Sequence, residues 1–573
     1  MRSIAPTTIS RARAALGLLV LMCGSLALVG TGDALAAIAH SSSARGAWST
    51  PKLVPGIVAL DHTRFNSAAV TTVSCPARNW CGAGGTYGDV HGNSQAFVVV
   101  GGPEAGGLAR EVPGLAMLNH GSASLTSLSC ASPGNCSAGG SYQNASLTTT
   151  AYVVNEVHGA WQRAHSLVES PTGEVSDITA LSCSAPGDCS AVGDDASNLA
   201  VVTSEVSGTW GPASIVPGLS VLGTTGSLTS ISCASPGDCS AGGSVGNSTI
   251  PENPQPFVVN QAGGTWGSAQ EIPGVAALNV GDMAAVTSLS CGAPGDCSAG
   301  GYYTDAKAAQ QLFVATEHHH TWQAGRELPG LQALNGGGFS TLASLSCRGA
   351  GACAAVGRAS VHMGSGSLYV SEGIVAVESA GSWHAARVVP GREDLQSSAL
   401  TSVSCGSPTA CTVVGYTVSG ASQPVAADES SGVWQALHPT SGPQQQTAAS
   451  HAGPLVVACA AALSCVAGGW MPSSIRTEAM LMTERPRAPA PAISHLSPAG
   501  GPARGGTVVV VYGTHLDGAT SVRFGAKPGS DVHVIDPGAL RVTSPPGVDT
   551  VEVRVTTGGG TTQTGSHTRF TYR

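Results

Sequence analysis

The stretch Leu125-Thr-Ser-Leu-Ser-Cys-Ala-Ser-Pro-Gly-Asn-Cys-Ser-Ala-Gly-Gly140 contains the feature that decides the fold of this 573-residue chain. Its two cysteines are separated by five residues, and this Cys-x5-Cys spacing occurs eight times, with successive pairs starting 50 to 58 residues apart. A period of this length indicates a repeat protein in which each unit is one supersecondary element. The pairs are Cys75 and Cys81, Cys130 and Cys136, Cys183 and Cys189, Cys233 and Cys239, Cys291 and Cys297, Cys347 and Cys353, Cys405 and Cys411, and Cys459 and Cys465.

Each cysteine pair brackets a predicted β-hairpin. Residues 125–130 alternate between two faces as a strand does, and the following Ala-Ser-Pro-Gly-Asn is a turn, because Pro presets one backbone angle and Gly allows a positive one. In an antiparallel hairpin the two cysteines then face each other within reach of a disulfide. The sequence therefore predicts eight disulfides. Zinc is the alternative, but a zinc site needs four ligands, and no second Cys or His pair recurs at a fixed offset.

Two further strands complete each unit. The third is typified by Ala151-Tyr-Val-Val-Asn155, a Gly-x-Trp turn such as Gly159-Ala-Trp161 follows, and a fourth strand ends at Val-Pro-Gly, as at Val216-Pro-Gly218. Four short strands per unit are typical of a β-propeller blade, and a string of independent β domains is the alternative. The Gly-x-Trp turns resemble the Asp-box (BNR) repeats of sialidase-like propellers. The acidic residue and the serine of that box are not consistently present, as Asn260-Gln-Ala-Gly-Gly264 shows, so the resemblance implies a fold rather than an activity.

The two ends of the repeat region complement each other. Gly46-Ala-Trp48 and Leu53-Val-Pro-Gly56 provide a fourth strand before the first cysteine pair, whereas residues 477–483 provide a third strand after the last pair and no fourth. Pairing the two ends leaves only short, protected edges. We predict an all-β chain in which residues 37–484 form an eight-bladed β-propeller closed by an N-terminal strand, with Trp48 completing the blade of Cys459 and Cys465. Seven blades plus one stray unit is the alternative.

The N-terminus resembles a secretory signal peptide over residues 1–36. It has a basic start, an apolar run from Ala14 to Val29 and the small-x-small site Ala34-Leu-Ala36. An uncleaved anchor is less favoured, because the run is shorter than the roughly 20 residues of a spanning helix, and lipidation at Cys23 is less favoured because Met22 precedes it. Cleavage would remove Cys23 and leave 16 cysteines, an even number that suits an oxidising compartment. We expect a secreted or cell-surface monomer without a transmembrane segment in the mature chain.

The C-terminal segment differs from the repeats. Residues 485–490 are a Pro-rich spacer, and they are followed by Pro491-Ala-Ile-Ser-His-Leu-Ser-Pro498, Gly505-Gly-Thr-Val-Val-Val-Val-Tyr-Gly513 and Val551-Glu-Val-Arg-Val-Thr-Thr557. These motifs resemble an IPT/TIG domain over residues 491–573. The resemblance implies an immunoglobulin-like β-sandwich, which short strands between Gly/Pro turns also predict, and a spacer or interaction module.

Composition and motifs restrict the function. Only 10% of the residues are charged, the formal charge is −9, and lysine is scarce, so no basic stripe exists for a nucleic acid. No His-Glu-x-x-His motif or phosphate loop is present. The run from His318 to His320 suits a solvated turn better than a metal site, since no further ligand recurs beside it. We therefore predict no catalytic, cofactor-binding or metal-binding residues and no cofactor.

The leading function hypothesis is a secreted, non-enzymatic protein that binds an unknown extracellular polysaccharide or protein. The alternative is a sialidase-like glycoside hydrolase or lyase, which would need two carboxylates facing one bond. The isolated acidic residues that depart from the repeat are better explained as surface charge; they include Asp194, Asp195, Asp305, Glu393 and Asp394. A sialidase would also cluster arginines around a carboxylate, whereas the arginines here are scattered along the sequence, for example Arg110, Arg326, Arg358 and Arg387.

Overall fold

The computed structural model describes residues 46–61, 68–100, 107–167, 174–246, 253–281, 283–336, 338–362, 369–391, 397–419, 421–440, 453–472, 477–486 and 489–573. The predicted signal peptide, Glu393 and Asp394 lie outside these ranges. None of the helices in the described part of the chain is long and apolar enough to cross a membrane.

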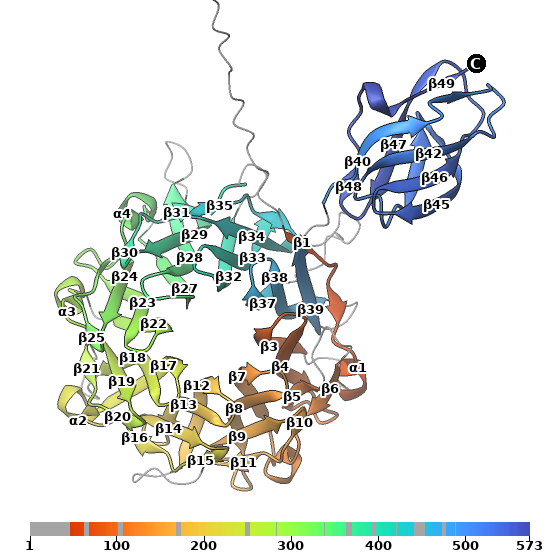
Figure 1. Ribbon diagram of the computed structural model, residues 1–573. Helices are drawn as coiled ribbons and strands as arrows, with labels where there is room; N and C mark the ends of the chain where they lie inside the picture. Colours follow the sequence, from red (N-terminus) through yellow and green to blue (C-terminus); the bar gives the residue numbers. More distant parts are fainter. Residues whose placement is uncertain are drawn as a thin grey trace, which may run out of the picture. The chain divides into compact units, whose positions relative to one another are not determined.

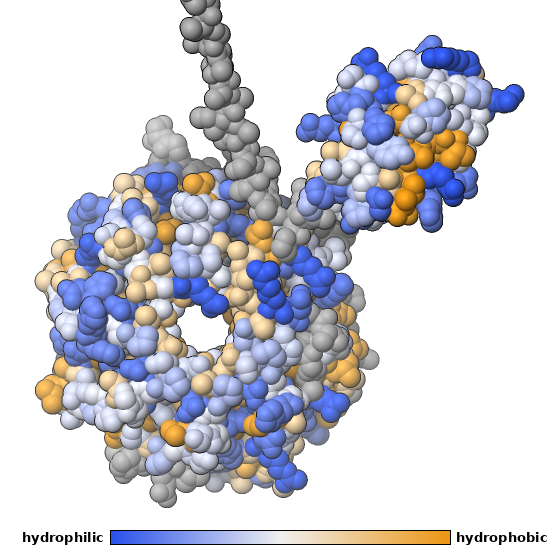
Figure 2. Space-filling view, in the orientation of Figure 1, coloured by the Kyte–Doolittle hydropathy of each residue, from blue (hydrophilic) through white to orange (hydrophobic). Residues whose placement is uncertain are grey.

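The described residues before the C-terminal segment form eight antiparallel sheets, arranged as in a β-propeller around a central opening (Figures 1 and 2). We number them sheet 1 to sheet 8 in the order of their cysteine pairs. Within sheets 1 to 7, the first three strands are neighbours in chain order and the outer strand or segments pair with the third, so each sheet is a meander whose first strand lies beside the opening. The all-β prediction and the propeller architecture are confirmed.

The first strands of sheets 1 to 8 are β3 (Ala69–Ala77), β7 (Ala123–Ser132), β12 (Val175–Ala185), β17 (Thr225–Ser235), β22 (Ala284–Ala293), β27 (Ser340–Cys347), β32 (Ser398–Ser407) and β37 (Gly453–Ala461). The second strands are β4 (Trp80–Gly88), β8 (Asn135–Gln143), β13 (Asp188–Asp195), β18 (Asp238–Gly246), β23 (Asp296–Thr304), β28 (Cys353–His362), β33 (Ala410–Ser419) and β38 (Ser464–Pro472). The third strands are β5 (Ser94–Val100), β9 (Thr149–Val157), β14 (Ala200–Val206), β19 (Gln255–Ala262), β24 (Gln310–His318), β29 (Tyr369–Ser379), β34 (Ala421–Ser430) and β39 (Thr477–Pro486).

The outermost strand is β6 (Leu108–Glu111) in sheet 1 and a pair of two- or three-residue segments in the other sheets. In sheets 2 to 7 these segments are β10 (Ala160–Trp161) and β11 (His165–Ser166), β15 (Thr209–Trp210) and β16 (Ser214–Ile215), β20 (Thr265–Trp266) and β21 (Gln270–Glu271), β25 (Thr321–Trp322) and β26 (Arg326–Glu327), β30 (Ser382–Trp383) and β31 (Arg387–Val388), and β35 (Val433–Trp434) and β36 (His438–Pro439). In sheet 8 they are the N-terminal β1 (Gly46–Trp48) and β2 (Lys52–Leu53).

A disulfide closes the inner hairpin of every sheet, at the cysteines that the Cys-x5-Cys spacing predicts. The Cα atoms of the paired cysteines are 3.9 to 4.1 Å apart, which is close enough for a bridge between facing strands. The bridges join Cys75 to Cys81, Cys130 to Cys136, Cys183 to Cys189, Cys233 to Cys239, Cys291 to Cys297, Cys347 to Cys353, Cys405 to Cys411 and Cys459 to Cys465.

In sheet 2 the turn between the bridged cysteines requires a glycine. Gly134 has a φ of 73°, and a Cβ there would lie 2.7 Å from the backbone nitrogen of Gly159 in the outer turn. That nitrogen instead donates to the carbonyl oxygen of Gly134 at 2.8 Å, which ties the two turns together.

Neighbouring sheets are joined by a repeated serine contact near the opening. The backbone N–H of the first cysteine in each of sheets 2 to 8 donates to the hydroxyl of the serine that precedes the cysteine of the sheet before it, at 2.9 to 3.1 Å. Ser74, for example, accepts from Cys130. Sheet 8 has Ala458 at the serine position, so its side chain offers no acceptor to sheet 1.

The N-terminal segments of the chain pair with the last sheet. β1 and β2 are antiparallel to β39, with Trp48 opposite Glu484 and Lys52 opposite Leu481. Val54 after β2, Val70 of sheet 1 and Val466 of sheet 8 share one buried hydrophobic cluster. β39 continues to Pro486, so the first two residues of the predicted 485–490 spacer belong to a strand.

A single helical turn follows the Val-Pro-Gly element or its variants in five places, each beginning after a glycine with a φ of 73° to 84°. These turns are α1 (Ile57–Leu60), η1 (Leu115–Met117), α2 (Leu219–Leu222), α3 (Val275–Leu278) and α4 (Leu331–Leu334). They lie in the connections between sheets, and their first residues are buried.

The C-terminal segment is a two-sheet β-sandwich with its own hydrophobic cluster, which includes Val511, Phe524 and Phe570. One sheet contains, in order, β40 (Ala492–Ser497), β42 (Val508–Thr514), β46 (Ala539–Thr543) and β45 (Ser530–Asp536). The other contains β41 (Gly500–Gly501), β49 (Arg569–Tyr572), β47 (Thr550–Thr557), β43 (Ser521–Phe524) and β44 (Lys527–Pro528), with β48 (Gly560–Thr561) beside β47 and the short helix η4 (Ser566–Thr568) before β49.

Candidate binding clefts between the sheets

A carboxylate or amide side chain recurs opposite the repeat tryptophan. In sheets 2 to 7 it lies five residues before the tryptophan, and the two residues are cross-strand partners. In sheet 8 the partner is the N-terminal Trp48. These carboxylate and amide residues are only 0 to 4% exposed. The pairs are Glu156 with Trp161, Glu205 with Trp210, Gln261 with Trp266, Glu317 with Trp322, Glu378 with Trp383, Glu429 with Trp434 and Glu484 with Trp48.

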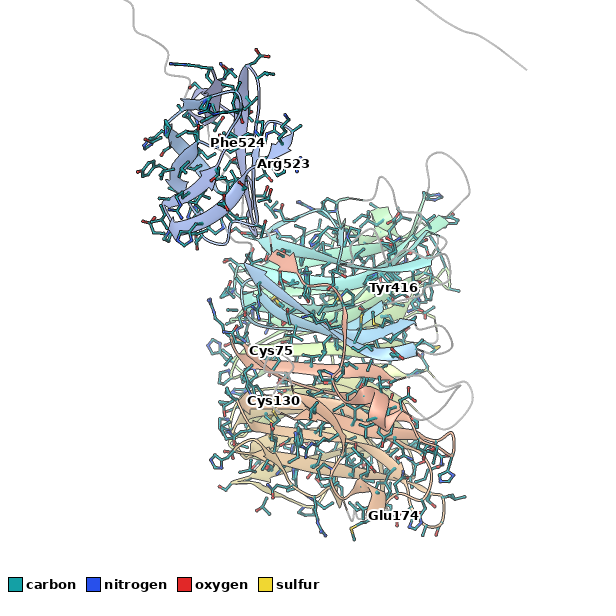
Figure 3. The ribbon with its side chains drawn as sticks, turned by 90° about the vertical axis from the view of Figure 1, so that its right-hand side faces the viewer. Cys75, Cys130, Glu174, Tyr416, Arg523 and Phe524 are labelled. Atoms are coloured by element: carbon teal, nitrogen blue, oxygen red, sulfur yellow. A yellow bond between two sulfur atoms is a disulfide. The ribbon has the colours of Figure 1, made fainter. Side chains whose placement is uncertain are left out.

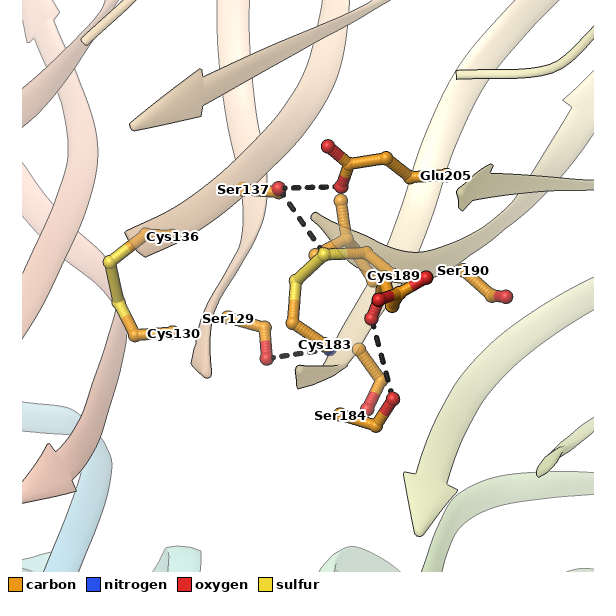
Figure 4. The surroundings of a disulfide bond; sticks show 12 residues. Ser129, Cys130, Cys136, Ser137, Cys183, Ser184, Cys189, Ser190 and Glu205 are labelled. Atoms are coloured by element: carbon orange, nitrogen blue, oxygen red, sulfur yellow. Dashed lines mark hydrogen bonds between the residues drawn. A yellow bond between two sulfur atoms is a disulfide. The ribbon is translucent and has the colours of Figure 1, made fainter. Parts of the chain in front are cut away.

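At the boundary of sheets 2 and 3 the neighbouring sheet satisfies the buried carboxylate (Figure 4). Ser137 of β8 donates its hydroxyl to Glu205 Oε2 at 3.2 Å. Asn155 of β9 donates its Nδ2 to Glu205 Oε1 at 2.6 Å and accepts from Trp210 Nε1 at 2.9 Å through its Oδ1. A buried charged group is tolerated when it is hydrogen-bonded in this way.

At three further boundaries the neighbouring sheet also provides polar partners for the buried glutamate or glutamine. Gln261 accepts from Ser190 and donates to Ser204. Glu317 accepts from Ser240 and from the Asn260 amide, whose oxygen accepts from Trp322. Both oxygens of Glu378 accept hydroxyls of sheet 5, from Ser298 at 2.7 Å and Thr316 at 2.9 Å. These polar side chains therefore hold adjacent sheets together.

Burial of these carboxyl groups favours their protonated form. It raises the pKa of Glu205, Glu317 and Glu429 above the ordinary value, and that of Glu156 to about 7. Hydrogen bonds from serine and asparagine oppose the increase in pKa at Glu205 and Glu317. Donors on the adjacent sheet therefore reduce the cost of keeping these two glutamates in the interior.

A cleft lies next to the buried glutamate and its hydrogen-bond partners at the boundary of sheets 2 and 3. Its volume is about 330 Å³. It opens beside the hairpin turns, since its walls include Pro186 and Gly187 of the inner turn and Ser207 and Gly208 of the outer turn. Figure 3 shows the cysteines Cys75 and Cys130 toward this face of the ring and Tyr416 and Glu174 toward the other. We call this space the sheet 2–3 cleft.

The equivalent space between sheets 6 and 7 is larger, about 450 Å³, and we call it the sheet 6–7 cleft. Ala354 and Val377, which are cross-strand partners, occupy the positions of Ser137 and Asn155. Glu429 and Trp434 are retained and line the cleft. Within the described residues, Glu429 accepts only backbone N–H groups, from Gly432 and Cys411, and the buried Trp434 Nε1 has no partner.

The remaining lining of the sheet 6–7 cleft combines apolar and polar groups. Val375, Ala376 and Ala385 provide apolar wall, and the exposed His384 and Arg387 lie at the margin. His384 Nε2 is 2.6 Å from the hydroxyl of Ser379. Glu378 also borders the space, but both of its carboxylate oxygens are already engaged by sheet 5.

The boundary of sheets 1 and 2 also lacks the serine, but its sheets are closer together. Gly82 occupies the serine position, and a Cβ there would lie 2.7 Å from the Sγ of Cys130. Trp80 packs with Trp161 against the cluster that contains this disulfide. At this boundary the loss of the serine is therefore accompanied by a closer approach of the two sheets.

At the boundary of sheets 7 and 8 an acid replaces the amide. The Thr412 hydroxyl lies 2.9 Å from Asp428 Oδ1 and 3.3 Å from Glu484 Oε2, so its one hydrogen is shared between the two carboxyl groups. Burial and the adjacent Asp428 carboxyl raise the pKa of Glu484 to about 9. The two carboxyl groups lie beside the strand β1, because Glu484 is opposite Trp48.

The residues singled out from the sequence are dispersed. Asp195 and Asp305 accept backbone N–H groups within tight turns, and His318 Nδ1 lies 3.2 Å from Asp296 Oδ1. Arg358 lies over the ring of Phe339, 5.4 Å from its centroid. Of the four arginines, only Arg387 lines one of the two clefts.

Sequence reasoning missed the buried glutamates. Their signal is present as a Glu-x4-Trp spacing in five of the units, for example from Glu205 to Trp210. The Gly-x-Trp motif covers the turn between the two residues, whereas the acid lies outside that motif. The departure at Ala354 and Val377 becomes visible only when the partners of that acid on the neighbouring sheet are known.

Comparison with known proteins supports the C-terminal assignment. Residues 491–572 match the model of the IPT/TIG domain, which confirms that prediction. No curated protein matches the chain.

Solved structures with propeller folds align at low similarity. A structure of YCF48 bound to D1 peptide has 11% identity and a TM-score of 0.35, covering 76% of this chain and 99% of that chain. The β-propeller domain of the trilobed protease from Pyrococcus furiosus has 8% identity and a TM-score of 0.37, covering 66% and 100%. An Aleuria aurantia lectin in complex with α-methyl-L-fucoside has 11% identity and a TM-score of 0.27, covering 56% and 97%. The assignment of the propeller rests on the strand pairing of this chain, not on these alignments.

Proposed function

We propose that this chain is a secreted, non-enzymatic binding protein whose ligand site is the sheet 6–7 cleft. The observation that carries the proposal is the change at Ala354 and Val377, which leaves Glu429 and Trp434 in place but without side-chain partners beside a cavity of about 450 Å³. A cavity of this size with a few convergent polar groups is typical of small-ligand sites. The ligand is an extracellular polysaccharide or protein.

The scaffold of the proposal is an eight-bladed ring closed by the N-terminal strand. Its support is the pairing of β1 and β2 with β39 and the hydrophobic cluster shared by the first and last sheets. Eight hairpin disulfides suit an oxidising compartment. The IPT/TIG domain adds an interaction or spacer module.

An array of polysaccharides, cell-wall fractions and extracellular proteins tests the function. The mature protein, produced under oxidising conditions, should retain at least one class of ligand, and a variant in which the sheet 6–7 cleft is filled by Ala354→Ser and Val377→Asn should lose it. Absence of binding to every class on the array would overturn the function. If the wild type and the variant retain the ligand equally, the binding function stands, but its site is not the sheet 6–7 cleft.

A sialidase-like hydrolase or lyase is the second candidate, and one pair of acids favours it. Asp177 and Asp194 are cross-strand partners, each with a buried unpartnered oxygen. Burial raises the pKa of Asp177 to about 6, and burial with the Asp177 charge raises that of Asp194 to about 7. Such groups could exchange a proton near neutral pH.

The cavity beside this pair weakens the hydrolase candidate. It measures about 260 Å³ and is lined by Asp194, whereas Asp177 does not border it. Two carboxylates that flank one glycosidic bond must both reach it. Hydrolysis of chromogenic glycosides by the wild type, abolished by Asp194→Asn, would establish the second candidate in place of the first.

A further inference from the structure

The geometry points to a neutral sugar residue with adjacent hydroxyl groups as the ligand of the sheet 6–7 cleft, bound by Glu429 and Trp434. This inference rests on the proposed function, because it takes the cleft as the binding site. It adds the chemical class of the ligand and the role of each side chain.

The sheet 2–3 cleft shows what Glu429 and Trp434 lack. There a single side chain, Asn155, donates to the glutamate from its nitrogen and accepts from the tryptophan Nε1 through its oxygen. The hydroxyl of Ser137 provides a second donor to the same glutamate. A ligand that enters the sheet 6–7 cleft must therefore offer donors to Glu429 and one acceptor to Trp434 Nε1, all within the space of an amide and a hydroxyl.

Adjacent sugar hydroxyls meet this requirement. Each hydroxyl both donates and accepts, so one can donate to Glu429 while the next donates to Glu429 or accepts from Trp434 Nε1. A carboxylate also makes stronger hydrogen bonds than a neutral acceptor. An isolated carboxylate ligand fits poorly at this position, because it would bring a second negative charge beside the buried Glu429.

The shape and lining of the cleft favour a sugar over an amide side chain. Its volume of about 450 Å³ exceeds what one asparagine-sized group would fill, and sites for small ligands begin at about 300 Å³. Val375, Ala376, Val377 and Trp434 give one side an apolar surface against which C–H groups of a sugar ring can pack. The hydroxyls of Ser379, Thr409 and Ser431 at the opening can reach the outer hydroxyls.

Trp434 alone does not identify the site. The buried Nε1 atoms of Trp48, Trp161 and Trp383 also have no partner. At those boundaries, however, the glutamate is engaged by hydroxyls, is paired with an acid, or faces a sheet brought close by Gly82. Only the boundary of sheets 6 and 7, among the described ones, combines a retained glutamate and tryptophan, loss of both partner side chains and a cavity of this volume.

The experiment measures binding of free monosaccharides to the full mature protein by isothermal titration and saturation-transfer NMR. The probes are glucose, galactose, mannose and fucose, with acetamide and an asparagine-containing tripeptide as amide probes and glucuronate as a charged one. We expect one neutral sugar to bind with a dissociation constant on the order of 1 mM, as its small size implies. Glucuronate and the amide probes should bind at least tenfold more weakly.

Two variants locate the site. A354S/V377N places an asparagine in the wall of the cleft, at position 377, and a serine at the cross-strand position 354. It should lower sugar affinity at least tenfold while the protein stays folded, because it removes no native hydrogen bond. The matched control A196S/V221N makes the same chemical changes at exposed positions and should bind as the wild type does.

The outcomes separate this inference from the function on which it rests. Binding of the amide probes without any sugar would overturn the sugar class and keep the cleft. Sugar binding that A354S/V377N leaves unchanged would overturn the cleft as its site. Retention of a protein or a charged polymer on the array, lost in A354S/V377N and accompanied by no monosaccharide binding, would overturn the sugar class and leave the proposed function standing.

Discussion

The sheet 2–3 cleft and the sheet 6–7 cleft occupy the same place in the repeat and share a buried glutamate and a tryptophan, yet they differ in what meets those residues. In the first, Ser137 and Asn155 close the hydrogen-bond network; in the second, Ala354 and Val377 leave it open. The comparison teaches that a repeat protein can gain a candidate site when apolar residues replace the polar side chains that join two sheets. A group that joins two blades becomes available to a ligand once its partners are removed.

The largest effect should come from converting the first cleft into the second. Ser137→Ala with Asn155→Val removes both side-chain donors of Glu205 and the acceptor of Trp210, and each hydrogen bond to a buried charged group contributes about 2 kcal/mol, so the loss should be about 4 kcal/mol. Calorimetric melting of the mature protein measures it. A change in melting temperature no larger than that of an exposed Ser→Ala variant would show that the network does not hold these sheets.

The second effect depends on pH and is expected at the boundary of sheets 7 and 8, where Asp428 replaces the amide. The pKa of Glu484, raised to about 9, exceeds its ordinary value. The folded chain therefore keeps a proton that the unfolded chain releases, so this stability is complete below about pH 4.5 and is lost as the pH rises to about 9. Asp428→Asn should provide the donor that Asn155 gives to Glu205.

Melting temperatures between pH 5 and pH 10 test the Asp428→Asn prediction. The wild type should lose stability toward pH 9, and the variant should lose much less. Ser129→Ala, which removes a hydrogen bond to the backbone N–H of Cys183 and leaves the buried carboxyl groups in place, is the control and should keep the slope of the wild type. Parallel curves for the wild type and Asp428→Asn would contradict the assignment.

The third test asks whether the two clefts differ only in the side chains that meet the buried glutamate. The serine contacts beneath the two clefts have nearly the same length, 3.0 Å from Cys183 to Ser129 and 3.1 Å from Cys405 to Ser346. Ser129→Ala and Ser346→Ala should each cost about 1.5 kcal/mol, because each leaves a backbone N–H without its partner. Thermal unfolding of the two variants measures these costs, and unequal values would show that the two boundaries differ below the clefts as well.

The smallest effect should come from closing the open cleft. Ala354→Ser with Val377→Asn should stabilise the protein by about 1 kcal/mol, because two donors then reach Glu429 and the new amide oxygen can accept from Trp434. The change is measured as a rise in melting temperature in the absence of ligand. A lower melting temperature would mean that the apolar wall contributes more than the unmet hydrogen bonds cost.

The sequence predicts the scaffold well because its signals are local. The Cys-x5-Cys spacing, the turn around Gly134 and the alternation before Cys130 each fix a hairpin within a few residues. The assignment of Trp48 to the last sheet follows from counting strands, and its register opposite Glu484 agrees with it. The IPT/TIG segment is identified from its own motifs.

The candidate site was not predicted, for a physical reason. Glu429 and the residues that would normally meet it, Ala354 and Val377, are more than 50 residues apart and belong to different sheets. Alanine and valine in a buried strand carry no chemical signal by themselves. Their meaning depends on the polar residues that stand at the same positions in five other units, so it emerges only from the inter-sheet contacts.

The disulfides have a mechanical consequence. Each bridge closes a hairpin within one sheet, and none of the eight spans two sheets. Tension applied to the two ends of the chain would therefore meet no covalent crosslink between the first and last sheets, and would be resisted at their seam by the short strand β1 and segment β2 on β39. A pulling experiment should detach these segments first, while every hairpin stays locked until its sulfur–sulfur bond is reduced.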